Sequence, residues 1–512
     1  MKKNQRSVLF ICADQWRYDY FGFMKHKASL TPNIDKLAEK SSVFKSHFAG
    51  IVPCGPSRTT MLTGLYPFIH RSVTNGTPLD KRFTNIAKEV RKIGYLPSLY
   101  GYTDTSWDPR HLNPKDKKNF TYESPMEGFE SKYNLPGSEP ESWAKFLKKN
   151  GFKINKSSDL YKGKYPKNGE GFIYEPYKIP SEFSDTAFLA NQVIKDLRKK
   201  NNSFFKHVSF LKPHPPYNIA DPWFSLFKSK NIDLPNVSLT FKQLGKKHPL
   251  LNEIVKKFLD KESYKEIHYS ELKRKDVKNI RKSYLAMCAE VDYYIGKILK
   301  TLEESNQLNN TMIIFTSDHG EMLGENNLWG KLGWWDSSFR IPLIIHTPGQ
   351  KPNIINNLTE SVDLVPTIID WLGGEIPIDW NGQSLMPYIT NTKKNLKEKK
   401  FVVFDWDFRD FTSFVKNKKL SPEECNLSVI RTQKWKYVHF PTLPPLLFNL
   451  KDDPQEVKNL ANVKKFQNVK NKLLSQLLSH RMLHLERQLS NIKLTNKGPK
   501  TVHGPRNRKL KN

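Results

Sequence analysis

The chain has 512 residues, of which 38% are hydrophobic, including 31 Phe, 20 Tyr and 11 Trp. This composition excludes a disordered chain and indicates a folded, enzyme-sized protein with one large domain and a smaller one. The formal net charge of +32 fits either an anionic partner such as nucleic acid or a general compositional preference for lysine. We favour the second, because lysines recur throughout the chain, and we expect no nucleic acid partner. In either case the electrostatic field of this positive charge attracts anionic substrates.

The four cysteines, Cys12, Cys54, Cys288 and Cys425, show no pairing pattern and do not predict a disulfide framework. The N-terminal sequence MKKNQRSVLFICADQ has only a short apolar run and no small-residue cleavage site. It therefore predicts a first strand and not a signal peptide. No stretch reaches the ~18 apolar residues that a membrane span requires. We expect a soluble cytoplasmic protein without a membrane partner.

Four short apolar runs each end in polar side chains that can take part in chemistry. The runs are residues 7–13, 96–100, 204–211 and 312–316, followed by 14–15, 101–104, 212–214 and 317–319. Helical patterns at 33–40 and 83–93 lie between them, and this alternation predicts a mostly parallel sheet flanked by helices. Ligands bind at the carboxyl ends of such strands, so these polar residues are expected to meet at one rim.

The middle of the chain contains longer and less regular segments. Residues 105–200 and 218–275 have weak periodicity and are interpreted as insertions that wrap the sheet and shape the mouth of a pocket. A long amphipathic helix is predicted at 276–301, where apolar residues recur at helical spacing. A further buried strand is predicted at 339–347 and a further helix at 361–372.

A domain boundary is predicted within 373–400, where glycines and prolines give way to a lysine run. Beyond it, strands of a smaller antiparallel sheet are predicted at 401–404, 427–431 and 435–440. An apolar stripe predicts a helix at 463–489, and the basic residues that follow are interpreted as an arm or a disordered tail. The predicted units are a catalytic domain at 1–390, a smaller α+β subdomain at 391–490 and the tail at 491–512.

Residues 51–67, IVPCGPSRTTMLTGLYP, carry the most specific pattern. Gly55 and Pro56 suit the entry to a helix, so Cys54 lies at a predicted helix N-terminus. Such a terminus favours an anion, because its amide N–H groups are free and carry partial positive charge. Cys54 alone would be an ordinary small buried thiol. With Arg58 one turn further on, the same position suits a tetrahedral oxyanion.

The pentapeptide CGPSR resembles the C-x-P-S-R signature of type I sulfatases, a family of the alkaline phosphatase superfamily whose cysteine is oxidised to formylglycine after synthesis. Further matches, in the expected order, are T-P-N-x-D at 31–35, TTMLTGLYP at 59–67, D-x-x-P-T at 363–367 and LFNLKDDPQEVKNLA at 447–461. The resemblance spans residues 7–461. It implies an alkaline-phosphatase-like α/β fold, a formylglycine at Cys54 and a formylglycine-generating enzyme as a partner.

Longer matches indicate one branch of the family. They are ADQ at 13–15, GYTDTSWDPR at 101–110, KPHPPY at 212–217 and TSDHGEMLGENNLWGKLGWWDSSFRIPLII at 316–345. These stretches resemble phosphonate monoester hydrolases and related broad-range arylsulfatases. Classical sulfatases carry Lys-x-His where Tyr102 to Asp104 stand here, and its absence argues against a strict classical sulfatase. Members of this branch form oligomers through C-terminal arms, and the tail at 491–512 could serve the same purpose.

The resemblance implies one divalent cation. Its ligands would be Asp14, Gln15, Asp318, His319 and the modified Cys54. Carboxylates with an amide or imidazole neighbour suit a cation of the Ca²⁺ or Mn²⁺ kind. Many sulfatases carry Asp at the position of Gln15 and Asn at that of His319. The departure favours Mn²⁺ or another transition metal over Ca²⁺, because imidazole is the softer donor.

The resemblance also implies an anion pocket, carried over residue by residue. Its lining would be Arg58, Asn75, Tyr102, His214 and Lys331. Asp104, a further candidate for substrate binding, stands where the branch often has Thr. Each of these positions also has an ordinary structural interpretation: a turn for Asn75 and His214, a solvated loop for Lys331 and plain core for Tyr102.

The implied activity is hydrolysis of sulfate esters, phosphonate monoesters or phosphodiesters, which are anionic small-molecule substrates. The cation, Arg58 and Lys331 would neutralise the ester oxygens, a formylglycine hydrate would be the nucleophile, and His214 is a candidate proton donor to the leaving oxygen. The base that restores the aldehyde is not assigned. Two alternatives stay open: a metal-dependent phosphatase or phosphodiesterase that uses unmodified Cys54, and a non-catalytic basic binding protein on the same scaffold.

Overall fold

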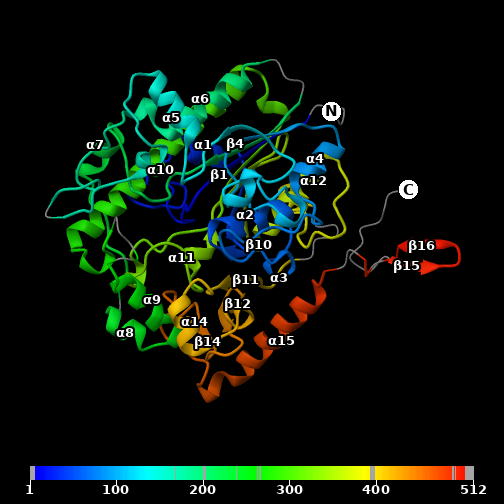
Figure 1. The fold of residues 1–512 in the computed structure, drawn as a ribbon. Helices are drawn as coiled ribbons and strands as arrows, with labels where there is room; N and C mark the ends of the chain where they lie inside the picture. The colour runs from blue at the N-terminus through cyan, green and yellow to red at the C-terminus, as the bar shows by residue number, and fades with distance from the viewer. Residues whose placement is uncertain are drawn as a thin grey trace.

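β1 (Ser7–Ala13) lies at the centre of a nine-stranded sheet in the computed structural model (Figure 1). The strand order is β10 (Asn353–Glu360), β2 (Ser42–Phe48), β9 (Leu343–His346), β7 (Thr311–Ser317), β1, β6 (Phe205–Phe210), β4 (Pro97–Gly101) and β5 (Glu130–Asn134), with β8 (Arg340–Ile341) beside β2. β1 pairs in parallel with β6 and β7, whereas the pairs that involve β8 or β9 are antiparallel. The predicted mostly parallel α/β sheet is therefore confirmed.

The structure describes residues 6–167, 169–199, 203–237, 239–261, 263, 267–392, 398–486, 489–490 and 492–501. Within these residues, no helix has both the length and the apolar character that crossing a bilayer requires. The helices that connect the strands or pack around them include α3 (Pro67–His70), α5 (Glu141–Lys149), α7 (Trp223–Lys228), α8 (Phe241–Gly245), α9 (Pro249–Leu259), α13 (Met386–Ile389) and α14 (Thr412–Lys418).

Helices cover both faces of the large sheet, because β1 is buried on both sides and its alternate residues belong to two apolar clusters. Val8, Phe10 and Cys12 pack in the cluster that includes α2 (Cys54–Thr63), α4 (Ile86–Lys92) and α12 (Leu364–Leu372). Leu9, Ile11 and Ala13 pack in the cluster that includes α1 (Pro32–Glu39), α6 (Asp185–Leu197) and α10 (Arg274–Glu304). The two helix layers lie on opposite sides of the sheet in Figure 1.

Most predicted strands and helices agree with the structure to within a few residues, but two predictions that concern the large sheet need correction. The strand predicted at 339–347 is interrupted at Pro342, which separates β8 from β9 because proline has no N–H for the ladder. Phe339 ends α11 (Asp336–Phe339) instead. The segment 105–200, interpreted as an insertion, contributes β5 to the sheet and α6 to a covering layer.

A smaller sheet has the order β14 (Leu446–Asn449), β13 (Trp435–His439), β12 (Asn426–Arg431), β11 (Val402–Asp407) and β3 (Ile51–Val52). Its four later strands are antiparallel, as predicted, whereas β3 joins β11 in parallel. Because only Pro53 separates β3 from Cys54, the smaller sheet leads into α2. The proposed division of the chain near residue 390 stays a prediction.

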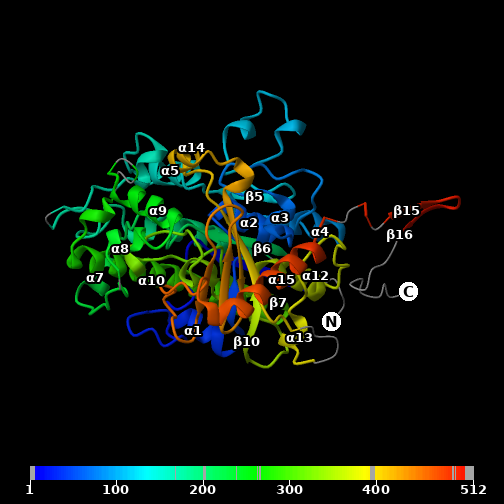
Figure 2. The same ribbon diagram turned by 90° about the horizontal axis from the view of Figure 1, so that it is seen from below.

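The C-terminal helix α15 (Gln467–Leu483) is shorter than predicted. Leu473 and Leu477 pack against the smaller sheet, but Met482, assigned to the same stripe, is 63% exposed. The tail at 491–512 was expected to be an arm or disordered. Its described part is a hairpin of β15 (Ile492–Thr495) and β16 (Gly498–Thr501) that stands away from the body (Figures 1 and 2). Residues 491 and 502–512 lie outside the described residues.

Asp292 on α10 fastens the start of α1. Its carboxylate accepts hydrogen bonds from the backbone N–H groups of Asn33 and Ile34 and from the Asn33 amide. Burial raises the pKa of Asp292 to about 6, although these hydrogen bonds oppose the shift. Between pH 4 and 6 the folded chain thus holds a proton that the unfolded chain has lost. The free energy of unfolding falls as pH rises through this window and stays lower above it.

We expect Asp292→Asn to remove a pH-dependent loss of about 3 kcal/mol, since one pKa unit corresponds to about 1.4 kcal/mol. The measurement is urea unfolding of wild type and variant at pH 4 and pH 7. Glu303→Gln, at an exposed position of the same helix, controls for the loss of a charge. An identical change with pH in wild type and Asp292→Asn would contradict this assignment.

Candidate active site

Residues from three distant segments meet at the carboxyl ends of the central strands. Asp14 follows β1, Asp318 and His319 follow β7, and Cys54 is the first residue of α2. One ligand atom from each of the four lies within 4.8 Å of all the others, and all four residues are buried. The convergence predicted from strand ends is present, and the cluster is a candidate site for a divalent cation.

The donor set of this cluster fits a cation. His319 Nε2 lies 3.2 Å from Cys54 Sγ and 3.6 Å from Asp14 Oδ1. On the other side of the ring, Nδ1 lies 3.0 Å from the Gly320 carbonyl oxygen, which assigns the proton to Nδ1 and leaves the Nε2 lone pair facing the cluster. Burial lowers the pKa of His319, against the opposing effect of Asp318. Two carboxylates and a neutral imidazole are ligands that a Mn²⁺-like ion prefers.

Arg58 lies against the carboxylates of the cluster. Its Nε donates to Asp318 Oδ2 at 2.9 Å, and one Nη contacts Asp14 Oδ2 at 3.1 Å. The other Nη donates to Ser209 Oγ at 2.6 Å and to the Tyr102 carbonyl oxygen at 3.2 Å. The residue is fully buried. Its positive charge therefore stabilises the carboxylates of two predicted metal ligands, Asp14 and Asp318. Direct binding of substrate oxygens by Arg58 stays a prediction.

Two other predicted pocket residues also hold parts of the site. The Tyr102 hydroxyl donates to Asp14 Oδ2 at 2.6 Å, and the Arg58 guanidinium lies over its ring at 4.2 Å. Asn75 Oδ1 accepts from the Gly55 N–H at 3.0 Å, at a helix start where Pro53 offers no side-chain cap. A side chain at position 55 would lie 2.8 Å from the Asp104 carbonyl oxygen, so glycine is required there.

Lys331 connects two other predicted site residues. Its Nζ donates to Gln15 Oε1 at 2.6 Å and lies 2.9 Å from His214 Nε2. His214 Nδ1 lies 2.5 Å from the Pro215 carbonyl oxygen, so its Nε2 is the acceptor for Lys331. Burial and the Lys331 charge lower the pKa of His214 to about 3, so the ring is neutral. The role of Gln15 as a metal ligand stays a prediction.

Cys54 and Asp104 are two acidic groups whose pKa burial raises. Burial and the nearby Asp14 carboxylate raise the pKa of the Cys54 thiol well above its usual range. Burial likewise raises the pKa of Asp104, and Arg58 only partly opposes this. Asp104 is 8% exposed, and its Oδ1 has no hydrogen-bond partner among the residues that the structure describes.

Several supporting residues were missed by the sequence analysis. Glu321 accepts from the Gln15 amide and from the N–H groups of Leu323 and Gly330. Tyr284, which the sequence places in the apolar stripe of α10, donates to the Gln15 carbonyl oxygen at 2.6 Å. Ser57 Oγ donates to the Asp318 carbonyl oxygen at 2.5 Å. The sequence contained a signal that could have indicated Glu321: this acidic residue lies two residues after the predicted ligand His319.

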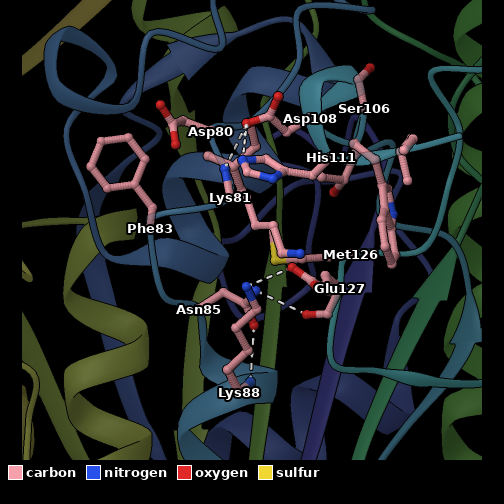
Figure 3. A pocket seen from close by; sticks show the side chains of 14 residues that line it. Asp80, Lys81, Phe83, Asn85, Lys88, Ser106, Asp108, His111, Met126 and Glu127 are labelled. Atoms are coloured by element: carbon pink, nitrogen blue, oxygen red, sulfur yellow. Dashed lines mark hydrogen bonds and ion pairs between the residues drawn. The ribbon is translucent and has the colours of Figure 1, made fainter. Parts of the chain in front are cut away.

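A separate cavity of about 50 Å³ lies beside the loop that follows Asp104 (Figure 3). Trp107 and Met126 line it together with Asp108, and no predicted site residue does. Asp108 accepts from the Lys81 N–H and pairs with Arg110. These charges satisfy one another, so the cavity offers no comparable chemistry.

Comparisons with known proteins identify the family of the chain. A family model described as Sulfatase matches residues 6–374, and one described as N-sulphoglucosamine sulphohydrolase, C-terminal, matches residues 324–482. The multifunctional alkaline phosphatase superfamily protein PehA of Trinickia caryophylli is 34% identical, over 96% of this chain and 98% of that protein. A choline-sulfatase of Rhizobium meliloti is 26% identical, over 90% of this chain and 83% of that protein.

Solved structures give the same result. The phosphonate monoester hydrolase of Agrobacterium radiobacter superposes with a TM-score of 0.91 and 35% identity, covering 98% of this chain and 100% of that one. The corresponding enzyme of Silicibacter pomeroyi has a TM-score of 0.90 and 33% identity, covering 97% and 99%. The chain belongs to the sulfatase family of the alkaline phosphatase superfamily, and it is a hydrolase.

Proposed function

We propose that the protein hydrolyses anionic esters, foremost phosphonate monoesters and also sulfate esters and phosphodiesters, by means of a formylglycine made from Cys54 and one divalent cation. The observation that carries the proposal is the position of Cys54 at the start of α2, with Sγ 3.2 Å from His319 Nε2 and 3.8 Å from Asp14 Oδ1. The likeness to two phosphonate monoester hydrolases, at 35% and 33% identity, supports the first substrate class.

Asp14, Asp318, His319 and position 54 would hold the cation, and Gln15 is a further proposed ligand. The imidazole donor favours Mn²⁺ over Ca²⁺. When bound, the cation and the formylglycine supply a metal-activated oxygen nucleophile and neutralise charge on the ester. A formylglycine-generating enzyme is the partner that this chemistry requires.

The residues of the chain would bind the ester and move one proton. Lys331 is an ammonium group: burial opposes its charge, but the Asp14 and Asp318 carboxylates help to raise its pKa overall. Lys331 Nζ donates to His214 Nε2, so Lys331 would be the proton source of this pair: a proton passed from Nζ to Nε2 leaves the Lys331 amine neutral, and Nε2 then gives that proton to the leaving oxygen. Arg58 forms ion pairs with both carboxylates and holds them in place.

Loss of His214 should matter most for substrates with poor leaving groups. We expect His214→Ala to lower kcat by about 10²-fold or more for an alkyl phosphonate ester, the usual contribution of a general acid. The loss should be much smaller for a 4-nitrophenyl ester, whose leaving group needs no proton. His111→Ala, in the separate cavity, is the control. Equal losses on both substrates would argue against proton delivery by this residue.

The alternative with unmodified Cys54 is less favourable, because burial disfavours the thiolate that a cysteine nucleophile requires. The test of the proposed function is a substrate panel. Protein produced together with a formylglycine-generating enzyme and loaded with Mn²⁺ or Ca²⁺ is assayed on a phosphonate monoester, an aryl sulfate and a phosphodiester. We expect turnover of all three, fastest on the phosphonate. No turnover, together with nucleic acid binding that weakens steeply with salt, would favour a binding protein.

The C-terminal arm is proposed to join copies of the chain. Exposed apolar side chains continue from α15 into the hairpin: Leu478 is 59%, Met482 63% and Leu494 78% exposed. Such a row needs a covering surface, and a second copy would supply it. Sedimentation of the full chain is expected to show a dimer or larger species, and deletion of residues 490–512 is expected to weaken it. A full-length monomer at micromolar concentration would remove this proposal.

A further inference from the structure

Lys331 lies on the loop that joins β7 to α11. Residues 320–335, all of which the structure describes, have little regular structure: only Glu325–Asn327 form a short 3-10 helix. Gly330 and Gly333 lie on either side of the lysine with φ of +72° and +70°, a conformation that glycine adopts freely. Such a segment does not fix its own position, so contacts from other elements must place Lys331.

The first half of this loop is attached to the body of the large sheet. One Nη of Arg17 donates to the Met322 carbonyl oxygen at 3.2 Å, and one Nη of Arg281 donates to the Leu323 carbonyl oxygen at 2.9 Å. These contacts lie eight and nine residues before Lys331. They leave the second half of the loop to be held from elsewhere.

Beyond the lysine, charged side chains of the smaller sheet and of the segment after it hold the loop. Lys436 of β13 donates from Nζ to the Trp334 carbonyl oxygen at 2.9 Å and to Asp336 Oδ1 at 2.6 Å. The same Nζ donates to Glu456 Oε2 at 2.7 Å, and Glu456 Oε1 accepts from the Asp336 N–H at 3.0 Å. Arg431 of β12 pairs with Asp336 Oδ2 at 2.9 Å. We call Lys436, Glu456 and Asp336 the loop clamp.

The loop clamp is costly to bury. Lys436 is 0% and Glu456 5% exposed, and Glu456 has a φ of +58°, which non-glycine residues rarely adopt. Buried ion pairs are often no more stabilising than apolar side chains of the same volume, so stability alone does not explain these charges. What they add is direction, because each donor fixes one acceptor at one place. Strain and cost of this kind are retained where the surrounding structure or the function requires them.

The groups that the clamp fixes are close to the active site along the chain. The Trp334 carbonyl lies three residues after Lys331, and α11, which Asp336 begins, contacts β3 of the smaller sheet (Figure 1). Lys331 Nζ lies 2.6 Å from Gln15 Oε1 and 2.9 Å from His214 Nε2. A shift of about 1 Å would take Nζ out of hydrogen-bond range of either atom.

We propose that the loop clamp positions Lys331 to bind an oxygen of the anionic ester, which makes Lys436 and Glu456 positioning residues of an active site that they do not touch. The inference rests on the proposed function in taking Lys331 to bind that oxygen. It gives the smaller sheet a part in substrate binding, through the second half of the loop.

The test is a double-mutant cycle on binding of inorganic sulfate to the Mn²⁺-loaded full chain, measured by calorimetry. The clamp variant combines Lys436→Met with Glu456→Gln. It removes two opposite charges with little change in volume, keeps an acceptor for the Asp336 N–H and leaves Asp336 paired with Arg431. We expect Lys331→Ala to weaken sulfate binding about 10- to 100-fold, as loss of a hydrogen bond to a charged group does.

The clamp variant alone is expected to weaken sulfate binding about fivefold or more. Combined with Lys331→Ala, the same two changes should weaken it less than twofold further, because the side chain through which they act is then absent. A change that merely disturbed the fold would weaken binding equally in both backgrounds.

The matched control is Lys206→Met with Asp196→Asn. This buried pair joins the start of β6 to α6, at the edge of the sheet opposite the site. Its loss should leave sulfate affinity within twofold of wild type. Hydrogen exchange of the amides in residues 322–335 should become faster in the clamp variant and stay unchanged in the control. If thermal unfolding shows that the clamp variant is not folded, Glu456→Gln alone takes its place in the cycle.

Four results would overturn the inference: sulfate binding by the clamp variant within twofold of wild type, equal weakening with and without the Lys331 side chain, unchanged exchange at 322–335, or no sulfate binding by wild type. Sulfate binding and hydrogen exchange require neither formylglycine nor turnover. Failure here is therefore distinguishable from failure of the proposed hydrolase activity, which the substrate panel measures.

Discussion

Cys54→Ala is expected to lower turnover of every ester in the panel by at least about 10⁴-fold, as loss of a covalent nucleophile does. The substitution removes the sulfur from which the formylglycine would be made and leaves only a methyl group at the start of α2. Cys54 is buried, and its Sγ makes contacts at 3.2 and 3.8 Å. Because the substitution removes only this one atom and adds none, it should not prevent folding. The measurement is steady-state kcat on the phosphonate monoester after identical production and metal loading.

The matched control is Cys425→Ala, because Cys425 is equally buried but lies just before β12 of the smaller sheet. Its activity should stay within a few-fold of wild type. If Cys54→Ala retained more than a tenth of wild-type turnover, position 54 would not supply the nucleophile, and the proposed chemistry would be wrong.

Arg58→Met is expected to reduce the free energy of unfolding of the metal-free protein by about 3–5 kcal/mol, the usual cost of leaving buried charges without their partner. The guanidinium contacts Asp318 at 2.9 Å and Asp14 at 3.1 Å and is fully buried. Methionine fills much of the same volume but provides no charge and no donor. The two carboxylates would then repel one another in a buried site.

Urea unfolding with and without Mn²⁺ tests this expectation. Added cation should restore part of the lost stability, because it also neutralises Asp14 and Asp318. Arg58→Lys should be intermediate, since one ammonium group cannot reproduce the fork of donors that reaches Asp14, Asp318 and Ser209 together. Arg110→Met is the control: this arginine pairs with Asp108 but is 64% exposed, so its loss should change the free energy of unfolding far less than the loss of Arg58. If Arg58→Met had the same free energy of unfolding as wild type, Arg58 would not be the residue that neutralises Asp14 and Asp318.

The location of the site could be predicted from the sequence because parallel strands share one carboxyl edge. That rule placed Asp14 with Asp318 and His319, across about 300 residues, before any contact was known. The sulfatase-like motif then added Cys54 and fixed the family. Both signals depend on local patterns that a single sequence contains.

The orientation of side chains could not be predicted in the same way. The spacing of Arg58 from Cys54 puts it one turn into α2, but only the packing against Ser209 and Tyr102 shows that it faces the carboxylates. Tyr284 looked like ordinary core, because its ring is part of an apolar stripe and only its hydroxyl reaches Gln15. The unpartnered oxygen of Asp104 is a property of the folded site alone.

The chemical state of residue 54 is the most direct test of the account. Trypsin should release residues 46–58 as one peptide, between Lys45 and Arg58. In active protein, mass spectrometry should find this peptide with one sulfur and two hydrogens lost and one oxygen gained, as expected for an aldehyde in place of the thiol-bearing carbon. A fully active preparation in which the peptide retains its unaltered cysteine would contradict the account.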